Sequence, residues 1–550
     1  MIEAEVHYSL HNFLRSQDRV PAWPHHLTMA RLVARGLRLG RSALIQVGAA
    51  CGYQGRYRLS YLAPALMWTE PLVLVATENV QQRLREVEIP RLQQWLQANK
   101  AIQTSNRWPS GDFQGLLLTS PQAWLADQLE QRGSFPCGIP TIIDGVDDLE
   151  DWTRTQLTLS IQPSDWDELM LACPMLKEVI RDARVQLTRA IFQHPANPYE
   201  CYLMSLAEQD ILRHLYATLQ QQNQGAIRGG ISEAVASHRA SAYHKYPQRQ
   251  LPQAWTNFWQ RFQMDEQMLW ATINRRQGLF SLYCAPAQVA SALSPIWARQ
   301  PVVLIGSALD QDAEAPIYLS SVGLSNLTKS PQALPIQGGV PVTCLKFSAD
   351  RHNELIQLYV PDRFPLPNTP QYQAAFIEQV HSLMSLSATA LGLTVILVGD
   401  MPLKSQVGAI LAAEFGSRVQ VEKTCLDDNG ILVSGWEFWR QHQSVLPAPQ
   451  LLVIATLPLP SLENPVVAGR VAYYKKTGQD WFRLYLLPTA MNELARAIAP
   501  VRDRQGVVAL LDSRVLHRSY GVQVLAALGP LARINYLDSS LFSQPNDSDL

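Results

Sequence analysis

The sequence predicts an α/β protein with two parallel-sheet domains and a helical insertion in the first of them. Two series of short apolar runs alternate with stretches of helical periodicity, a pattern typical of parallel sheets whose faces are covered by helices. Between the two series lies a long segment without such runs. The length of 550 residues suits several domains, and an apolar fraction of 47% supplies the cores that they need.

The first α/β domain is expected over residues 1–150. Residues 27–39 have helical periodicity and place Arg31, Arg35 and Arg38 on one face, at spacings i, i+4 and i+7. This arginine stripe predicts either a solvated helix face or a contact with nucleic-acid phosphates. The buried strands of the domain are predicted in four apolar runs: SALIQVG (42–48), PLVLVAT (71–77), GLLLTS (115–120) and PTIIDG (140–145).

Residues 151–275 are expected to form a wholly helical insertion, because periodic stretches rich in Gln, Leu and Arg replace the β-branched runs. Within this segment, aromatic residues recur at i, i+3, i+4 and i+7. This spacing is typical of a core-facing helix stripe, although exposed aromatic residues could also stack on bases. The residues concerned are Trp255, Phe258, Trp259 and Phe262.

Strand signals return after the insertion. Residues 276–335 are expected to complete the first α/β domain, with strands at 278–286 and 301–309. A second α/β domain is expected over residues 340–537, followed by a polar tail at 538–550. The predicted strands of the second domain are LTVILVGD (393–400), GILVSGWEF (430–438), QLLVIATLPLP (450–460) and GVVALLDSR (506–514).

Charge and composition exclude several classes of protein. The 46 basic and 47 acidic residues leave a net charge of −1, so any nucleic-acid contact needs a local basic surface. Residues 1–60, with eight arginines and three acidic residues, are the candidate for such a surface. The sequence contains no run of about 18 apolar residues, so no membrane span is predicted. The seven cysteines are isolated from one another, which predicts reduced thiols in a cytoplasmic protein and no metal site.

Seven short motifs, in the same order along the chain, resemble those of the DinG/XPD type of superfamily 2 DNA helicases. The resemblance covers nearly the whole chain and implies two RecA-like motor domains, an arch-like helical insertion in the first of them, and ATP-driven movement along DNA. IIDGVDDLED (142–151) is similar to the acidic box IIDEAHxLED of that family. The other motifs are LSYLAPAL (59–66), IGSAL (305–309), YVPDRFPLPNTPQY (359–372), FW (438–439), LPLPSLENPVVAGR (457–470) and GVVALLDSRVLHRSYG (506–521).

In that family a phosphate-binding loop precedes the LSYLAPAL motif, and the corresponding stretch here is ACGYQGRY (50–57). The resemblance assigns cofactor binding to Gly52, Gly55 and Arg56. A phosphate loop also needs a lysine for the phosphates and a Ser or Thr for Mg²⁺. Those positions hold Arg56 and Tyr57, and no lysine precedes Lys100. We therefore expect a sheet-to-helix turn without nucleotide, with weak nucleotide binding as the alternative.

Two other parts of the motor have also changed. The acidic box keeps Asp144 as a catalytic position, but Gly145 replaces the glutamate that orients water, and the carboxylates at 147, 148 and 150 are expected to point elsewhere. The arginine-finger helix keeps Arg502 as a catalytic position, while Ala499 stands where the finger itself would be. Arg496, three residues before Ala499, is a potential substitute.

These changes predict a nucleic-acid-binding protein of helicase fold in which ATP-dependent unwinding is lost or strongly reduced. The resemblance implies single-stranded or forked DNA as the partner, with ATP and Mg²⁺ as the cofactors of the family. No iron–sulfur cluster is expected, because only Cys51 and Cys137 lie near the interval where many members have four cysteines. Two alternatives stay open: an active, divergent ATP-dependent DNA helicase that uses Arg56, Asp144 and Arg502, and a scaffold that binds a protein partner through the insertion.

Overall fold

The structure, a computed structural model, describes residues 2–16, 23–232, 251–324, 342–351, 353–387, 392–427, 429–538 and 542. The chain divides into two compact units. The larger unit comprises Met1–Trp152, Ala290–Leu459 and Arg483–Leu550, and the smaller comprises Thr153–Val289 and Pro460–Phe482. We call the smaller one the insertion unit. The larger one contains two sheets, and we call the parts around them lobe 1 and lobe 2.

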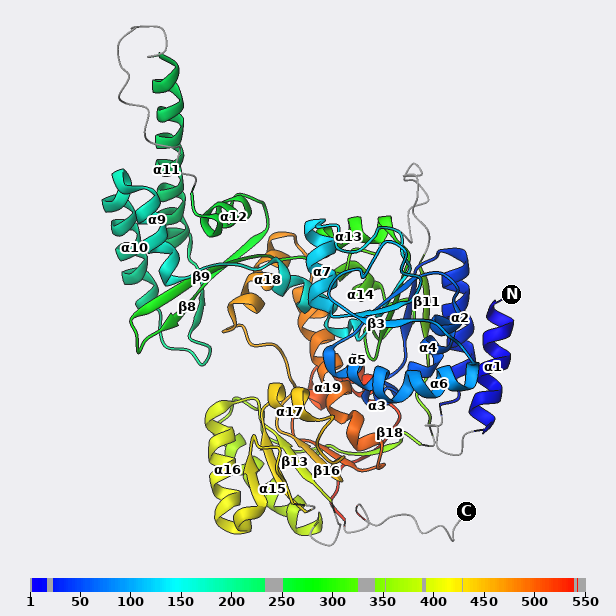
Figure 1. The fold of residues 1–550 in the computed structure, drawn as a ribbon. Coiled ribbons are helices and arrows are strands. Elements are labelled where there is room, and N and C mark those ends of the chain that lie inside the picture. The colour runs from blue at the N-terminus through cyan, green and yellow to red at the C-terminus, as the bar shows by residue number, and fades with distance from the viewer. Residues whose placement is uncertain are drawn as a thin grey trace, which may run out of the picture. The chain divides into compact units, whose positions relative to one another are not determined.

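Lobe 1 is built on a seven-stranded parallel sheet with the strand order β11-β1-β10-β5-β2-β4-β3 (Figure 1). Most of its strands are apolar and buried along their whole length, as expected for a parallel sheet covered on both faces. The strands are β1 (Ala43–Gln46), β2 (Leu72–Val75), β3 (Ile102–Thr104), β4 (Leu116–Thr119), β5 (Thr141–Asp144), β10 (Val302–Gly306) and β11 (Thr343–Lys346).

The helices of lobe 1 alternate with these strands along the chain. In order they are α1 (Ile2–Ser16), α2 (His26–Leu39), α3 (Ala49–Gln54), α4 (Arg58–Met67), α5 (Glu78–Arg83), α6 (Ile89–Leu96), α7 (Pro121–Glu130), α13 (Ala290–Arg299) and α14 (Pro316–Ser321). Helix α2 packs between α1 and α4. Helix α8 (Leu149–Leu157) follows β5 and runs from this unit into the insertion unit.

One strand of lobe 1 lies beyond the boundary expected from the sequence. Strand β11 pairs in parallel with β1, with Ala43 opposite Thr343, although the sequence predicts that the second domain begins at residue 340. Its sequence TCLK has a partly exposed burial pattern, as befits an edge strand. An edge strand needs no continuous apolar run, so the pattern that identifies the buried strands does not reveal it.

Lobe 2 repeats the architecture with a second seven-stranded parallel sheet, ordered β14-β15-β13-β16-β17-β12-β18. The prediction of an α/β fold with two parallel sheets is thus confirmed. The strands are β12 (Ile356–Tyr359), β13 (Thr394–Leu397), β14 (Val419–Val421), β15 (Ile431–Ser434), β16 (Leu451–Ile454), β17 (Val507–Leu510) and β18 (Leu531–Ile534). The helices are α15 (Tyr372–Ser387), α16 (Met401–Phe415), α17 (Trp436–His442), α19 (Leu487–Arg502), α20 (Arg514–His517) and α21 (Gly521–Ala527).

Of the polar tail predicted at 538–550, only Asp538 and Phe542 lie within the described residues. Phe542 is buried in the core of lobe 2, where it joins residues of the central strands and of α15. The run SQPNDSDL (543–550) lies outside the described residues.

The insertion unit is not wholly helical, which corrects the expectation for residues 151–275. It contains a four-stranded antiparallel sheet, β6-β9-β8-β7. The strands are β6 (Leu159–Ile161), β7 (Cys201–Leu203), β8 (Gln267–Asn274) and β9 (Leu279–Pro286). The helices are α9 (Pro163–Ala172), α10 (Lys177–Phe192), α11 (Leu206–Ser232), α12 (Gln253–Phe262) and α18 (Pro465–Lys476).

The hairpin of β8 and β9 explains this correction. The run 278–286 is expected in the returning part of the first domain, but β9 pairs with β8 from Leu279 opposite Asn274 to Pro286 opposite Gln267. The hairpin also extends into residues that are expected to be helical. Pairing between strands is a tertiary choice, and an isolated apolar run does not state which sheet it joins.

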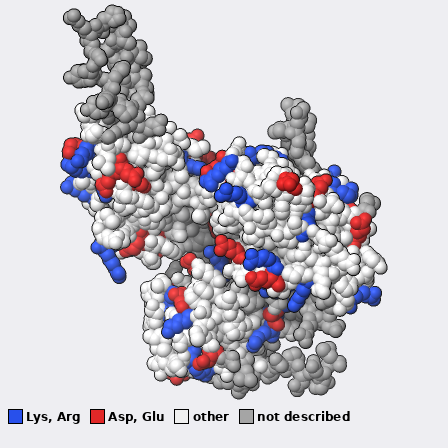
Figure 2. Space-filling model, viewed as in Figure 1, with Lys and Arg blue, Asp and Glu red and all other residues white. Residues whose placement is uncertain are grey.

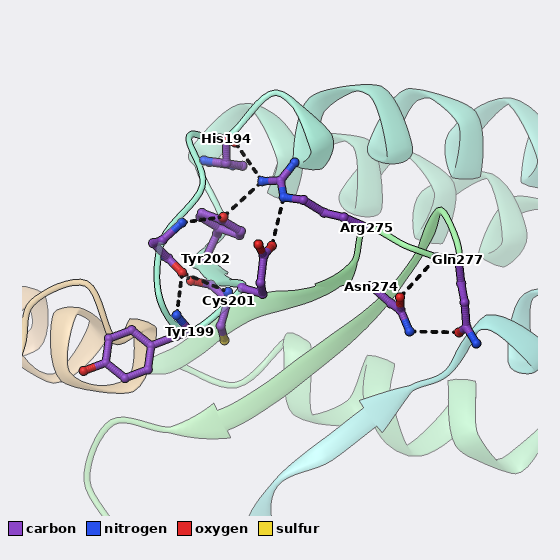
Figure 3. Close-up of polar contacts among 9 residues, drawn as sticks. His194, Tyr199, Cys201, Tyr202, Asn274, Arg275 and Gln277 are labelled. Carbon is purple, nitrogen blue, oxygen red and sulfur yellow. Dashed lines mark hydrogen bonds and ion pairs between the residues drawn. The ribbon is translucent and has the colours of Figure 1, made fainter. Parts of the chain in front are cut away.

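The turn of this hairpin is fastened to the loop that precedes β7. Figure 3 shows the Arg275 guanidinium donating to the His194 carbonyl oxygen of that loop and to the Tyr202 hydroxyl of β7, both at 3.1 Å. Arg275 also pairs with Glu200 at 2.9 Å. These contacts hold the end of the hairpin against the helical part of the unit.

Two further observations describe the core of the insertion unit. The aromatic stripe of α12 faces inward, with Trp255 and Phe258 fully buried and Trp259 2% exposed, so the core interpretation is the one that the structure shows. Helix α18 packs on β7 and β8, although residues 460–482 lie between two segments of lobe 2 in the sequence. The approach is close at Gly469, where an added Cβ would lie 2.7 Å from the Met268 sulfur.

Basic and acidic side chains are interspersed on the face shown in Figure 2. This distribution agrees with the net charge of −1. The helices of the described residues include none that is both long and apolar enough to cross a bilayer.

Candidate functional site

The carboxyl ends of three neighbouring strands bring the expected motor residues together. Strands β1, β10 and β5 are adjacent in the sheet of lobe 1, and parallel strands end at the same edge. Gly48 follows β1, Ser307 follows β10, and Asp144 is the last residue of β5. These three positions therefore lie side by side at the same edge of the sheet. Helix α19 of lobe 2 packs against α3 there. A cavity of about 250 Å³ is lined by these elements, including Tyr57, Asp144 and Arg496.

The stretch expected to be a phosphate loop is largely a helix. Residues Ala49–Gln54 form α3, which ends at Gly55 in the left-handed conformation with φ +63°. The backbone N–H of Gly52 donates to the Gly48 oxygen at 2.9 Å, and the N–H of Arg56 donates to the Cys51 oxygen at 3.2 Å. The N–H groups of Gly55 and Arg58 are used in the same way. A phosphate cradle needs such N–H groups to point at the ligand, and here they bond within the chain.

The two glycines kept from the motif serve packing. An added Cβ at Gly52 would lie 2.4 Å from the Ser307 Cβ, so α3 rests directly on the turn after β10. An added Cβ at Gly55 would lie 2.4 Å from the guanidinium carbon of Arg58. Both absent side chains therefore make room for protein groups of lobe 1.

Asp144 is engaged by two buried tyrosines. The Tyr57 hydroxyl donates to one carboxylate oxygen, and the Tyr61 hydroxyl donates to the other at 2.8 Å. Tyr57 precedes α4 and Tyr61 lies within it, four residues apart, so both project from one helix face. Burial, together with the neighbouring Asp144 carboxylate, raises the pKa of both tyrosines well above the usual value. Both hydroxyls therefore stay protonated as donors at neutral pH.

Arg58 supplies the positive charge of this cluster. Its guanidinium lies 3.6 Å from Asp144 and 3.7 Å from Glu88, and its side chain is 11% exposed. Burial by itself would lower the pKa of Arg58, but Asp144, Tyr57, Tyr61 and Glu88 together outweigh it, and the pKa is raised. Asp144 thus joins Tyr57, Tyr61 and Arg58 in a closed polar cluster at the end of β5, where the sequence led us to expect a carboxylate for a metal.

Arg56, at the position of the phosphate-binding lysine, points to lobe 2. Its guanidinium forms an ion pair with Asp503, just after α19, and the Gln54 amide donates to the same carboxylate. The pair is partly exposed, with side-chain exposures of 21% for Arg56 and 26% for Asp503.

The carboxylates after β5 do not point away from the site, which corrects that expectation for Asp147 and Asp148. Gly145 has φ +84°, and this left-handed turn directs the following residues back over the end of β10. Asp147 accepts hydrogen bonds from the Ser307 N–H at 2.8 Å, from the Ser307 hydroxyl at 2.7 Å and from the Ala308 N–H at 3.0 Å. Asp148 pairs with Arg496 of α19 at 2.8 Å.

Arg502, the arginine that the sequence keeps in the finger helix, does not line the cavity that contains Asp144. Its guanidinium donates to the backbone oxygens of Glu354, Leu528, Gly529 and Pro530. Burial lowers the pKa of Arg502 to about 10, against the opposing effect of Glu354. Arg502 borders a second cavity of about 540 Å³, which is also lined by Gly48, just before α3, and by Lys346 of β11. Its contacts join segments of lobe 2.

The arginine stripe of α2 is exposed at Arg31, Arg35 and Arg38. Arg38 pairs with Glu3 of α1 at 2.7 Å, so part of the charge of the stripe is neutralised inside lobe 1. The stripe belongs to α2, whereas the cluster around Asp144 is built from β5 and from the start of α4. The structure therefore describes the stripe and the cluster as separate features of lobe 1.

Sequence reasoning missed Arg58, Tyr61 and Asp503 as members of the site. The spacing of Tyr57 and Tyr61 on α4 was a usable signal, because residues four apart share a helix face. No local pattern in the sequence points to Asp503, because Asp503 lies 447 residues from Arg56, the residue that it contacts. Among the described residues, the structure contains no group of three or more His, Cys, Asp or Glu side chains placed to hold a metal ion.

Solved structures share this architecture along nearly the whole chain. The structure of S. tokodaii Xpd4 is 13% identical, with a TM-score of 0.53, covering 93% of this chain and 100% of that one. A structure described as an XPD helicase is 10% identical, with a TM-score of 0.54, covering 94% and 100%. This chain has the DinG/XPD helicase fold.

A family model and two curated relatives match shorter parts of the chain. Residues 447–530 match the family described as the helicase C-terminal domain. The ATP-dependent DNA helicase YoaA of Haemophilus influenzae is 28% identical over 139 residues, which are 24% of this chain and 22% of that protein. YoaA of Escherichia coli is 30% identical over 108 residues, which are 19% of this chain and 17% of that protein. The matched region thus spans about a fifth of each of these relatives.

Proposed function

We propose that this chain is a nucleic-acid-binding protein of DinG/XPD helicase fold in which ATP-dependent unwinding is lost or strongly reduced. The partner is single-stranded or forked DNA. The match of residues 447–530 to a helicase C-terminal domain, and the two relatives named as ATP-dependent DNA helicases, support a DNA-directed role.

The hydrogen bond from Tyr57 to Asp144 is the observation that carries this proposal. Mg²⁺ requires oxygen ligands at about 2.0–2.1 Å in near-octahedral geometry. Both oxygens of Asp144 instead accept hydrogen bonds from buried tyrosines, and Arg58 lies beside them. A divalent cation would be repelled by that guanidinium and would have to displace the tyrosine hydroxyls. These residues do not fit a magnesium nucleotide.

The phosphate side of the site supports the same conclusion. The N–H groups of Gly52, Gly55, Arg56 and Arg58 are used within the chain. The Arg56 side chain pairs with Asp503. Gly145 has no side chain to orient an attacking water. Arg496 lies near the position of an arginine finger but pairs with Asp148.

The contact with DNA is proposed to include the exposed arginines of α2. Arg31, Arg35 and Arg38 lie in residues 1–60, the locally basic part of the sequence. Lysine and arginine side chains that neutralise phosphates make binding depend on salt. A contact of this kind needs no hydrolysis, so it is compatible with a site that no longer holds a magnesium nucleotide.

The proposal is tested by measuring phosphate release with and without single-stranded DNA, alongside titration with a fluorescent ATP analogue. We expect no DNA-stimulated release above the buffer blank, and saturable DNA binding that weakens at higher salt. Release that depends on DNA and disappears in Asp144→Ala would show an active, divergent helicase. Absence of DNA binding even at low salt would favour a protein-interaction scaffold.

A further inference from the structure

The two lobes meet at several points around the cavity that contains Asp144. We infer that a nucleotide-independent latch holds lobe 1 against lobe 2, formed by Arg496 on Asp148 and by Arg56 on Asp503. This inference rests on the proposed function, because a motor that cycles through ATP would have to break the latch at each turnover.

The first contact of the latch is made by Arg496 in α19. Its guanidinium lies 2.8 Å from Asp148 and 3.9 Å from Asp147, both in the turn after β5. The Arg496 side chain is 17% exposed. Burial by itself would lower the pKa of Arg496, but Asp147, Asp148 and Glu493 raise it. Arg496 therefore keeps its positive charge, and its removal would leave these acidic groups without their cation.

The second contact of the latch lies at the end of α3. Asp503 pairs with Arg56, and the Gln54 amide donates to the other oxygen of the same carboxylate. One side chain of lobe 2 is thus held by two side chains of lobe 1. A carboxylate held in this way is restricted in orientation, which makes it a stronger partner than a single exposed ion pair.

Two neutral hydrogen bonds accompany the charged pairs. The Tyr53 hydroxyl of α3 donates to the Gln443 oxygen of lobe 2 at 3.0 Å. The Asn492 amide of α19 donates to the Leu309 oxygen of lobe 1 at 3.3 Å. The lobes are therefore joined at α3 and at the turns that follow β5 and β10.

The chemistry of the charged pairs explains why no nucleotide is needed. In nucleotide hydrolases, phosphate oxygens supply the negative charge that basic groups on facing elements bind. In this chain the basic groups are Arg56 and Arg496, and the carboxylates of Asp503 and Asp148 supply the negative charge. A ligand can shift a conformational equilibrium only by its difference in affinity for the two states. Because the arginines already have anionic partners, the lobes stay together without nucleotide.

The natural cysteines allow the lobes to be labelled without new ones. Cys137 in lobe 1 and Cys425 in lobe 2 are exposed, while the other five cysteines are buried or half-buried. Thiolates are the reactive form, and burial raises the pKa of Cys51 and Cys284 to about 12 and that of Cys201 to about 11. Burial also raises the pKa of Cys173 and Cys344. A donor and an acceptor dye will therefore attach preferentially at Cys137 and Cys425.

The experiment measures single-molecule energy transfer between these dyes in the full-length chain. In the natural chain we expect one transfer population, unchanged by ATP with Mg²⁺. In the Arg496→Ala, Asp503→Ala double variant we expect a second population of different transfer, raised at least about fivefold over the natural chain. The matched control is Arg132→Ala, which removes an exposed ion pair with Glu130 inside lobe 1 and should leave the transfer unchanged.

A charge exchange makes the test specific for the pair. Arg56→Asp alone should weaken the latch and raise the second population. Arg56→Asp combined with Asp503→Arg should restore the transfer of the natural chain. Circular dichroism checks that each variant folds. If a variant does not fold, Asp503→Asn, which removes the charge of Asp503 and keeps the size of its side chain, is measured instead.

The latch is overturned if ATP shifts the transfer of the natural chain, or if the double variant transfers like the control. It is also overturned if the exchanged pair fails to restore the natural transfer. Phosphate release without any change in transfer would reject the proposed loss of hydrolysis and leave the latch standing, so the two failures are distinguishable.

Discussion

The hydroxyl of Tyr57 donates a hydrogen bond to the carboxylate of Asp144, across 87 positions of the sequence. The sequence resemblance leads us to expect these two positions in a phosphate loop and an acidic box, where a hydroxyl and a carboxylate would meet through a metal ion. Here the longer tyrosine side chain spans the gap and makes the contact directly. The contact is therefore an internal one of lobe 1.

Stability should depend on this contact. Asp144→Ala would leave Arg58 with only Glu88 nearby and two buried hydroxyls without their acceptor, so we expect a loss of about 3–5 kcal/mol in the free energy of unfolding. Tyr61→Phe removes one hydrogen bond to a charged group and should cost about 1.5–3 kcal/mol. Urea unfolding of each variant measures these losses.

A surface variant controls for this comparison. Asp362 forms an exposed pair with Arg533 at 3.4 Å, and Asp362→Ala should cost no more than about 1 kcal/mol. If Asp144→Ala costs as little as Asp362→Ala, the cluster does not stabilise lobe 1.

Restoring the missing glutamate should not restore hydrolysis. Gly145→Glu places a side chain at φ +84°, a conformation that costs an L-residue roughly 1–2 kcal/mol. The variant should therefore unfold at lower urea concentration and still release no phosphate, because Tyr57 and Arg58 continue to occupy Asp144. Phosphate release on a par with an active helicase would contradict this interpretation of the site.

Stability should fall in alkaline solution. The pKa of Tyr57 and of Tyr61 is raised by burial and by Asp144 in the folded chain, while an unfolded tyrosine ionises near pH 10. Above about pH 10 the unfolded chain releases protons that the folded chain retains, so the free energy of unfolding decreases as the pH rises.

Tyrosine variants test the origin of that decrease. Urea unfolding at neutral pH and near pH 11 should show a smaller decrease in Tyr57→Phe than in the natural chain. Tyr199→Phe alters an exposed tyrosine (48% exposed) and should leave the decrease unchanged. Equal decreases in the two variants would place the alkaline sensitivity elsewhere.

The salt dependence of DNA binding should separate the arginines of α2. Arg31→Ala with Arg35→Ala should reduce the slope of log K against log salt by up to about 0.7 for each phosphate of a single strand that the variant no longer neutralises. Arg38→Ala should have a smaller effect, because Arg38 pairs with Glu3. Glu3→Ala releases Arg38 and should increase the slope. An unchanged slope in the first variant would move the DNA interface away from α2.

Purified protein should be colourless and contain no stoichiometric iron. The chain has seven cysteines, and those in lobe 1 and lobe 2 come from separate elements, so they do not supply the four thiolates that an iron–sulfur cluster needs. Elemental analysis and a visible absorption spectrum check this expectation. Several iron atoms per chain, with a visible absorption band, would contradict it.

Local patterns were sufficient for the frame of this protein. The apolar runs at 42–48, 71–77, 115–120 and 140–145 correspond to β1, β2, β4 and β5, because a strand buried on both faces must be apolar along its length. The spacing of the aromatic residues favoured an inward face for α12, because residues at i, i+3, i+4 and i+7 share one face of a helix. The changed residues of the expected phosphate loop could be read directly, since no lysine precedes Lys100 in the sequence.

Contacts between distant segments required the tertiary structure. From the sequence, Tyr57 was expected in place of a hydroxyl ligand and Arg496 near an expected arginine finger. The sequence did not show that Tyr57 donates to Asp144 or that Arg496 pairs with Asp148. It also placed the 278–286 run in the wrong sheet. Periodicity records whether a residue faces a core, whereas the partner of a polar group or strand depends on which segments the packing of the whole chain brings together.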